Sequence, residues 1–282
     1  MPPIVCSSHT ISGVMPGGVI ASRHRFEDRV KACAEAGFDG MCLHFRDYAE
    51  QRAAGKADKE LRAVLDEFGM VENSVEFLRD WFRPEGEANI RLALSAAGAF
   101  GARHINVSPD LDDEAHPIAA MGPAFAALCD RAADRGVGVA LELVAWGNVR
   151  TLDRALALLD LGGANAGLII DSWHVFRAGI GLDELATLSP ARIGCVQLSD
   201  AAATVVGPLS CDTMSRRFCG EGALDLRGLL DTLARMGVAA PLAVEVISPE
   251  AVGMVVQEAA RRAFETTMRV VGDSRLTVGA RG

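Results

Sequence analysis

Apolar and polar positions along the chain follow two spacings, one typical of strands and one typical of helices. Short, nearly continuous apolar runs predict strands at 3–7, 40–45, 70–76, 103–107, 136–144, 167–171, 192–198 and 242–247. Longer segments with helical spacing predict helices at 22–36, 58–68, 86–100, 119–135, 151–161, 182–188, 225–236 and 249–271. This regular alternation of strand and helix is typical of an α/β protein whose parallel sheet closes into a single (β/α)8 TIM barrel.

Glycine residues mark the ends of several predicted helices. Gly37, Gly69, Gly101, Gly136 and Gly237 each stand where a helical segment stops before a strand, which is the usual place for a glycine that ends a helix. No linker rich in Ser, Pro or Gly divides the chain. We therefore expect one barrel domain over residues 1–272 and a C-terminal tail over residues 273–282.

The composition narrows the class of protein. Hydrophobic residues make up 50% of the chain, yet no run approaches the ~18 consecutive apolar residues of a membrane helix. The seven cysteines form no CxxC pair, and the start MPPIVCSSHT lacks the features of a signal peptide, so we expect a cytoplasmic protein without a membrane partner. The net charge of −9 argues against nucleic acid, because phosphate binding needs clustered Lys and Arg. A small-molecule substrate is favoured.

Polar side chains stand at the ends of the last four predicted strands. Glu142, Asp171, Gln197 and Glu245 come one from each strand, and neighbouring strands lie about 4.8 Å apart, so the four can converge on one cation. Their oxygen atoms form a hard ligand set, which favours Mn²⁺ or Mg²⁺ over Co²⁺ or Zn²⁺. The alternative is that each acid is solvated or pairs with an arginine.

Five segments carry a resemblance to a known family. The stretches LELVAWGN, LIIDSWHVFRAG, CVQLSDA, RRFCGEGALDL and LAVEVISPE resemble the xylose isomerase-like TIM-barrel superfamily, in particular its sugar phosphate isomerase/epimerase-like branch. In that superfamily a Glu, an Asp, a His and a Glu bind one divalent metal, which implies Glu142, Asp171 and Glu245 here. The remaining position holds Gln197 instead of His, which is similar to the 3-dehydroshikimate dehydratases.

Further residues are candidates for the substrate pocket. The resemblance implies that His174 contacts substrate or a metal-bound water, whereas the simpler interpretation is a residue that caps a helix. Arg217 has counterparts that hold substrate oxygens, or it is an ordinary loop arginine. His44 and Glu76 reach the same rim from earlier strands, where they either line the pocket or are ordinary solvated residues at strand ends. Trp146 either walls the site or packs in the core.

Together these residues predict an enzyme that removes a proton next to a carbonyl. Glu142, Glu245 and His174 are the candidate catalytic residues. We expect a metal-dependent isomerase or epimerase acting on a carbohydrate or cyclic hydroxy-ketone, with a metal-dependent dehydratase as the alternative. An abasic-site endonuclease is disfavoured by the acidic charge and the few additional His and Asp residues, and a non-catalytic binding barrel by the gathered carboxylates. The aliphatic exterior and long last helix would suit a homodimer.

Overall fold

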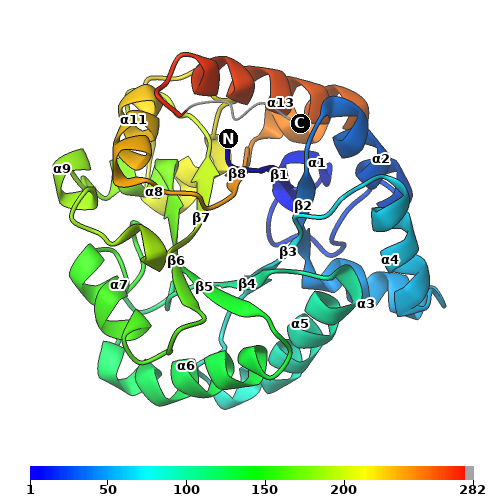
Figure 1. Cartoon of the computed structure of the whole chain (residues 1–282), viewed down its shortest axis with the longest axis horizontal. Coiled ribbons are helices and arrows are strands. Elements are labelled where there is room, and N and C mark those ends of the chain that lie inside the picture. The colour runs from blue at the N-terminus through cyan, green and yellow to red at the C-terminus, as the bar shows by residue number, and fades with distance from the viewer. Residues whose placement is uncertain (277–282) are drawn as a thin grey trace.

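Eight parallel strands form a closed barrel within residues 1–276, the part of the chain that the computed structural model describes (Figure 1). The strands follow one another around the barrel in chain order, which confirms the predicted (β/α)8 architecture. Their bounds are β1 Ile4–Ser7, β2 Gly40–His44, β3 Ser74–Leu78, β4 His104–Val107, β5 Gly138–Glu142, β6 Ala166–Asp171, β7 Ile193–Leu198 and β8 Leu242–Val244.

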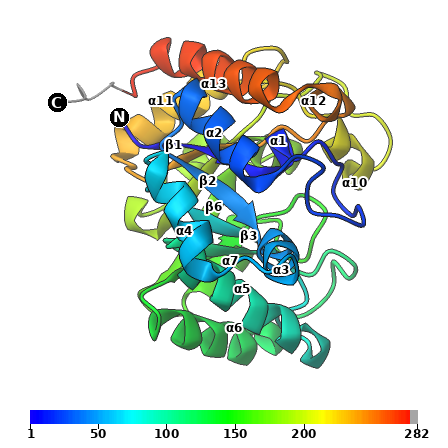
Figure 2. The same ribbon diagram turned by 90° about the vertical axis from the view of Figure 1, so that its right-hand side faces the viewer.

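Helices surround the barrel on its outside (Figure 1). The α-helices are α1 Ser8–Ile11, α2 Phe26–Ala36, α3 Phe45–Ala53, α4 Asp58–Glu67, α5 Glu87–Phe100, α6 Ile118–Ala133, α7 Leu152–Leu159, α8 Ser172–Arg177, α9 Leu182–Leu185, α10 Leu209–Asp212, α11 Leu226–Met236, α12 Pro249–Gly253 and α13 Val256–Gly272. Short 3₁₀ turns are η1 Pro84–Gly86, η2 Pro190–Arg192 and η3 Thr213–Ser215. Figure 2 shows the barrel from the side, with α10 and the loop after α1 at the same end.

Several elements differ from the prediction. The strand expected at 70–76 lies at Ser74–Leu78, because the backbone N–H groups of Val71 and Glu72 both donate to the carbonyl of Asp39 and the chain bends there before the strand begins. The helix expected at 249–271 is divided into α12 and α13. Short α8 and the polar α3 were not predicted, since neither shows a clear apolar spacing.

The predicted glycine stops are confirmed. Gly37 and Gly101 end α2 and α5 with φ of 108° and 62°, a left-handed conformation that favours glycine. A Cβ atom on Gly37 would also lie 2.9 Å from the ring of Phe264 on α13. Gly69, Gly136 and Gly237 have positive φ as well.

The barrel interior is arranged in layers, and the layering positions the site. One layer is a small apolar cluster of Val5, Cys42, Ala140, Ile169, Cys195 and Ala243. Side chains two residues apart on a strand point to the same face. The next layer, toward the carboxyl ends of the strands, therefore includes Ser7, His44, Glu76, Glu142, Asp171, Gln197 and Glu245.

The described residues at the C-terminus contact the rest of the chain. Leu276 is buried, and the backbone N–H of Arg275 bonds to Asp231, whereas residues 277–282 of the predicted tail lie outside the described residues. The domain boundary at 272 thus stays a prediction. All seven cysteines are free thiols. Among residues 1–276, no helix is both long and apolar enough to cross a membrane.

Candidate functional site

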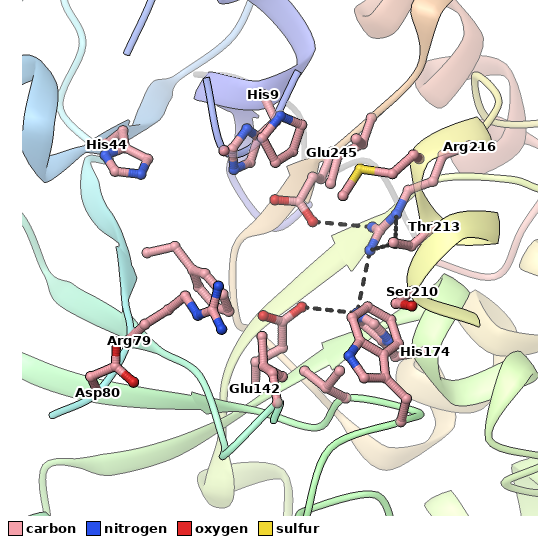
Figure 3. Close-up of a pocket in the computed structure, with 18 of the residues that line it drawn as sticks. His9, His44, Arg79, Asp80, Glu142, His174, Ser210, Thr213, Arg216 and Glu245 are labelled. Atoms are coloured by element: carbon pink, nitrogen blue, oxygen red, sulfur yellow. Dashed lines mark hydrogen bonds and ion pairs between the residues drawn. The ribbon is translucent and has the colours of Figure 1, made fainter. Parts of the chain in front are cut away.

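A pocket of about 660 Å³ opens at the carboxyl end of the barrel (Figure 3). This volume lies within the range of about 300–1,000 Å³ that is usual for small-molecule sites. Titratable side chains from several strand ends face one another across it, namely His9, His44, Glu142, His174, Arg216 and Glu245. The pocket therefore lies where the carboxylates were expected from the sequence.

The four predicted metal ligands occupy two depths. Glu142 and Glu245 line the pocket, whereas Asp171 and Gln197 do not, and these two are only 1% and 2% exposed. Asp171 and Gln197 are paired in the register of β6 and β7. Glu142 and Asp171 also offer oxygen atoms within 4.8 Å of each other, in a group completed by His174. Two acids can thus reach a substrate, while the other two side chains support the site from within the barrel.

His174 is fixed in one orientation by the start of α8. The Asp171 side chain caps this helix by accepting from the backbone N–H of His174 at 3.0 Å, so the cap is Asp171 and not His174. The His174 Nδ1 accepts from the backbone N–H of Ala145 at 3.2 Å. In the neutral ring the proton must then be on Nε2, which lies 3.4 Å from Glu142 Oε1. The Nε2 of His174 therefore faces both the Glu142 carboxylate and Arg216 Nη2, which lies 3.3 Å away.

Arg216 is a buried cation of the site that was not among the residues predicted from the sequence. Its Nη1 lies 2.7 Å from Asp171 Oδ2 and 3.1 Å from Glu245 Oε2, and the residue is 3% exposed. Burial alone would raise the pKa of Asp171, but the Arg216 charge and His174 hold that pKa below its ordinary value. For Glu245, burial dominates and raises the pKa well above its ordinary value despite Arg216.

Arg217, the predicted substrate contact, is not brought to the pocket. It is exposed, and its guanidinium bonds to the carbonyl of Glu221. A backbone bridge between Asp200 and Arg217 holds this segment extended, and successive side chains of an extended segment point to opposite sides. Arg216 therefore points inward and Arg217 outward, so the position of the expected pocket arginine moves by one residue.

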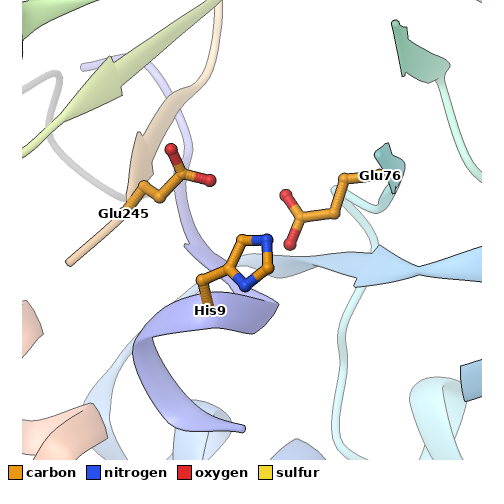
Figure 4. A group of neighbouring side chains, drawn as sticks. All are labelled: His9, Glu76 and Glu245. Atoms are coloured by element: carbon orange, nitrogen blue, oxygen red, sulfur yellow. The ribbon is translucent and has the colours of Figure 1, made fainter. Parts of the chain in front are cut away.

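Glu76 lies behind the pocket and does not line it. Its carboxylate accepts from Ser7 Oγ at 3.1 Å and from the backbone N–H of Ser8 at 3.0 Å. Ser7 Oγ also lies 3.1 Å from Glu245 Oε1. Burial raises the pKa of Glu76 from 4.5 to about 7. Figure 4 shows Glu76 and Glu245 directed toward His9.

His9 and His44, which lie across the pocket from His174 (Figure 3), are neutral histidines. Burial, followed by the charge of Arg216, lowers the pKa of His9 to about 4. Burial also lowers the pKa of His44 to about 3, and its Nδ1 accepts from the backbone N–H of Arg46 at the start of α3. His44 was predicted to line the pocket, whereas His9 was not selected although it follows the first strand directly.

The loops around the pocket supply the remaining lining. Trp146 lines the pocket, as expected, with its ring centroid 5.3 Å from that of His174. Arg79, Asp80 and Asp112 also line it and were not singled out from the sequence. Their only signal was their place in the loops that follow the third and fourth predicted strands, where charged residues are common.

The inner residues fit a hard divalent cation in their chemistry. Glu142 and Asp171 gather with His174, whereas Glu245 gathers with His9 and Glu76. Gln197 Oε1 is buried without a hydrogen-bond partner among residues 1–276. A buried oxygen without a partner is costly unless a ligand uses it. The four predicted ligands all offer oxygens, the set that Mg²⁺ and Mn²⁺ prefer. Arg216 provides the positive charge at Asp171 and Glu245.

A family model and several known proteins match large parts of this chain. A family model described as "Xylose isomerase-like TIM barrel" matches residues 30–269. The chain is 28% identical to a 3-dehydroshikimate dehydratase of Pseudomonas aeruginosa over 235 residues, which is 78% of this chain but 36% of the dehydratase. It is 31% identical to an inosose isomerase of Bacillus velezensis over 147 residues, 51% of this chain and 52% of the relative. The matches thus span about a third and about half of these two relatives.

Solved structures share the fold at low sequence identity. The IolI protein with a bound zinc atom superposes with a TM-score of 0.83 at 18% identity, covering 98% of this chain and 100% of that chain. D-allulose 3-epimerase from Methylomonas sp., solved with D-allulose, gives a TM-score of 0.72 at 17% identity and covers 95% and 96%. These likenesses describe the barrel fold.

Proposed function

Because the chain belongs to the xylose isomerase-like TIM barrel family, we propose that it is a divalent-metal-dependent isomerase or epimerase that removes a proton next to the carbonyl of a cyclic hydroxy-ketone. The proposal rests chiefly on one observation, that the carboxylates of Glu142 and Glu245 both face a single pocket. Two such groups near the substrate allow one to remove a proton and the other to deliver one, at a neighbouring carbon or at the other face of the same carbon.

Each of the two carboxylates has a different environment. Glu245 is paired with the Arg216 guanidinium at 3.1 Å, while Glu142 lies 3.4 Å from the Nε2 of His174. This asymmetry suits one acid as proton donor and the other as acceptor. His174 Nε2–H and the Arg216 guanidinium supply donors for the oxygen atoms of the substrate, on which negative charge develops in the enediolate.

A divalent cation held by Glu142, Asp171, Gln197 and Glu245 would polarise the substrate carbonyl and stabilise the enediolate by several kcal/mol as a Lewis acid. Mn²⁺ and Mg²⁺ suit these oxygen donors, with Co²⁺ and Zn²⁺ as alternatives. The names of two relatives indicate a cyclic substrate, since inosose and 3-dehydroshikimate are both six-membered carbocyclic hydroxy-ketones.

A dehydratase is the second candidate, favoured by Gln197 and by the dehydratase match over 78% of this chain. Both reactions begin with the same proton removal. They differ in the next step, because an enediolate that expels a β-hydroxyl loses water, whereas one that is reprotonated gives an isomer.

The two outcomes can be separated with two substrates. Chelated protein would be reloaded with Mn²⁺ or Mg²⁺ and incubated separately with inosose and with 3-dehydroshikimate. An isomer detected by NMR with inosose supports the isomerase, and a rising catechol absorbance with 3-dehydroshikimate supports the dehydratase. Glu245→Gln should lower either rate about 10²–10⁴-fold, whereas Glu258→Gln on the exposed face of α13 should not. Full activity and metal content in Glu245→Gln would contradict the proposal.

A further inference from the structure

The guanidinium of Arg216 lies between two of the carboxylates that were predicted to bind the metal. Nη1 contacts Asp171 and Glu245 at 2.7 and 3.1 Å, and Nη2 lies 3.1 Å from the hydroxyl of Thr213. Figure 3 shows the guanidinium reaching between Glu245 and His174. Both carboxylates therefore have oxygens already engaged by a buried cation.

A guanidinium and a divalent cation make conflicting demands on these oxygens. Each N–H bond occupies a carboxylate oxygen that a metal would use, and two positive charges a few ångströms apart repel strongly where water is excluded. Conversely, Arg216 is buried and depends on Asp171 and Glu245 to balance its charge. The two cations cannot both keep their best contacts.

The contact with His174 strengthens this conflict. Arg216 Nη2 lies 3.3 Å from His174 Nε2, but Ala145 already donates to Nδ1, so a neutral ring carries its proton on Nε2. Two donors thus face each other, and this contact contributes no hydrogen bond. Arg216 is held in its place mainly by the carboxylates, together with Thr213.

We propose that Arg216 is an internal counter-ion that competes with the divalent cation for Asp171 and Glu245 and moves off both when the cation binds. This inference rests on the metal requirement of the proposed function. Because Arg216 lines the pocket, the released guanidinium turns toward the substrate space and offers paired donors to a substrate oxygen or carboxylate. Cation binding then precedes and prepares substrate binding.

A matched arginine provides the control. Arg177 also forms an ion pair with a buried aspartate, Asp212, at 3.0 Å. The guanidiniums of Arg177 and Arg216 lie 5.7 and 5.4 Å from the ring centroid of Trp173. Arg177 does not contact any of the predicted metal ligands in the described chain. It therefore tests the loss of a buried arginine without touching the cation site.

The test measures binding of Mn²⁺ to chelator-treated protein from the EPR signal of free Mn²⁺, with no substrate present. The Arg216→Gln variant lacks the guanidinium that competes for the two carboxylates, so it should bind Mn²⁺ roughly tenfold to a hundredfold more tightly than the wild type. The Arg177→Gln variant should bind Mn²⁺ as tightly as the wild type. Arg216→Lys keeps the charge but loses the planar fork, so it should show a smaller gain. Equal or weaker binding by Arg216→Gln would overturn the inference while leaving the proposed function intact. Absence of Mn²⁺ binding in every protein would overturn both.

Wild-type protein supplies a second readout if Arg216→Gln fails to fold without a cation. Titration with Mg²⁺ should change the tryptophan emission, since Arg216 leaves the face of Trp173. The emission of Arg216→Lys, refolded under the same conditions, should not change, because the lysine side chain is shorter and does not reach the Trp173 ring. Saturating Mg²⁺ binding without any change in wild-type emission would contradict the movement of Arg216.

Discussion

Replacing Glu76 with Gln should make the protein less sensitive to rising pH. Burial raises the pKa of Glu76 from 4.5 to about 7, so between these values the folded state keeps a proton that the unfolded state releases. The unfolded state binds fewer protons in this window, and the free energy of unfolding therefore falls as pH rises. Gln mimics the protonated acid and keeps its acceptor oxygen for Ser8.

The magnitude follows from the width of the window. Each pH unit between the two pKa values corresponds to about 1.4 kcal/mol, and partial ionisation near both ends reduces the total. The free energy of unfolding of Glu76→Gln minus that of the wild type should increase by about 2 kcal/mol between pH 5 and pH 7. Above pH 7 the difference should level off, because both states of the wild type are then ionised.

Urea unfolding of chelator-treated protein at pH 5, 6, 7 and 8 measures this difference. Glu258→Gln, with an exposed side chain on α13, should give a difference that barely changes with pH. A constant offset between Glu76→Gln and the wild type at all four pH values would refute the assignment of a protonated Glu76. A difference that becomes smaller as pH rises would mean that the pKa of Glu76 is shifted in the opposite direction, and would refute the assignment more strongly.

Three further outcomes are expected. His44 should stay neutral from pH 5 to 8, because burial lowers its pKa to about 3. A titration of its labelled imidazole nitrogens between pH 5 and 8, measured by NMR, would contradict this expectation. Arg29→Met should lower the free energy of unfolding in urea by about 3–5 kcal/mol, because it leaves buried Asp47 unpaired. Adding Asp47→Leu should recover most of this free energy. Equal stability of the single and double variants would contradict this expectation. Gln197→His should shift the ratio of Kd values toward Zn²⁺ over Mn²⁺, because imidazole is a softer ligand than an amide oxygen, and an unchanged ratio would argue that residue 197 does not bind the metal.

The barrel and its inward carboxylates could be predicted because both follow from short-range patterns. Each strand is a brief apolar run, and Glu142 and Asp171 stand at the ends of two of these runs. Because the strands of a (β/α)8 barrel are parallel, both residues lie at the carboxyl end of the barrel. The two-residue period also places Ser7 and Glu76 on inward-facing positions. The period does not tell which inward residue opens to the pocket, and Glu76 proved to lie behind it.

The position of Arg216 could not be predicted because a long-range contact decides it. Arg216 and Arg217 are adjacent and chemically identical, and only the bridge from Asp200 to Arg217 determines which side chain points inward. The start of β3 was missed for a similar reason, since the bend before it depends on hydrogen bonds to Asp39 in another part of the chain. Local spacing carries no information on either contact.

Deuterium exchange from D₂O into inosose, followed by NMR, tests the proposed proton removal most directly. With Mn²⁺-loaded protein the substrate should gain deuterium at a carbon next to its carbonyl, and Glu142→Gln and Glu245→Gln should each slow the exchange about 10²–10⁴-fold. Exchange that continues unchanged in both variants, or none in the wild type with either inosose or 3-dehydroshikimate, would contradict the assignment of this pocket as a site of carbonyl-adjacent proton transfer.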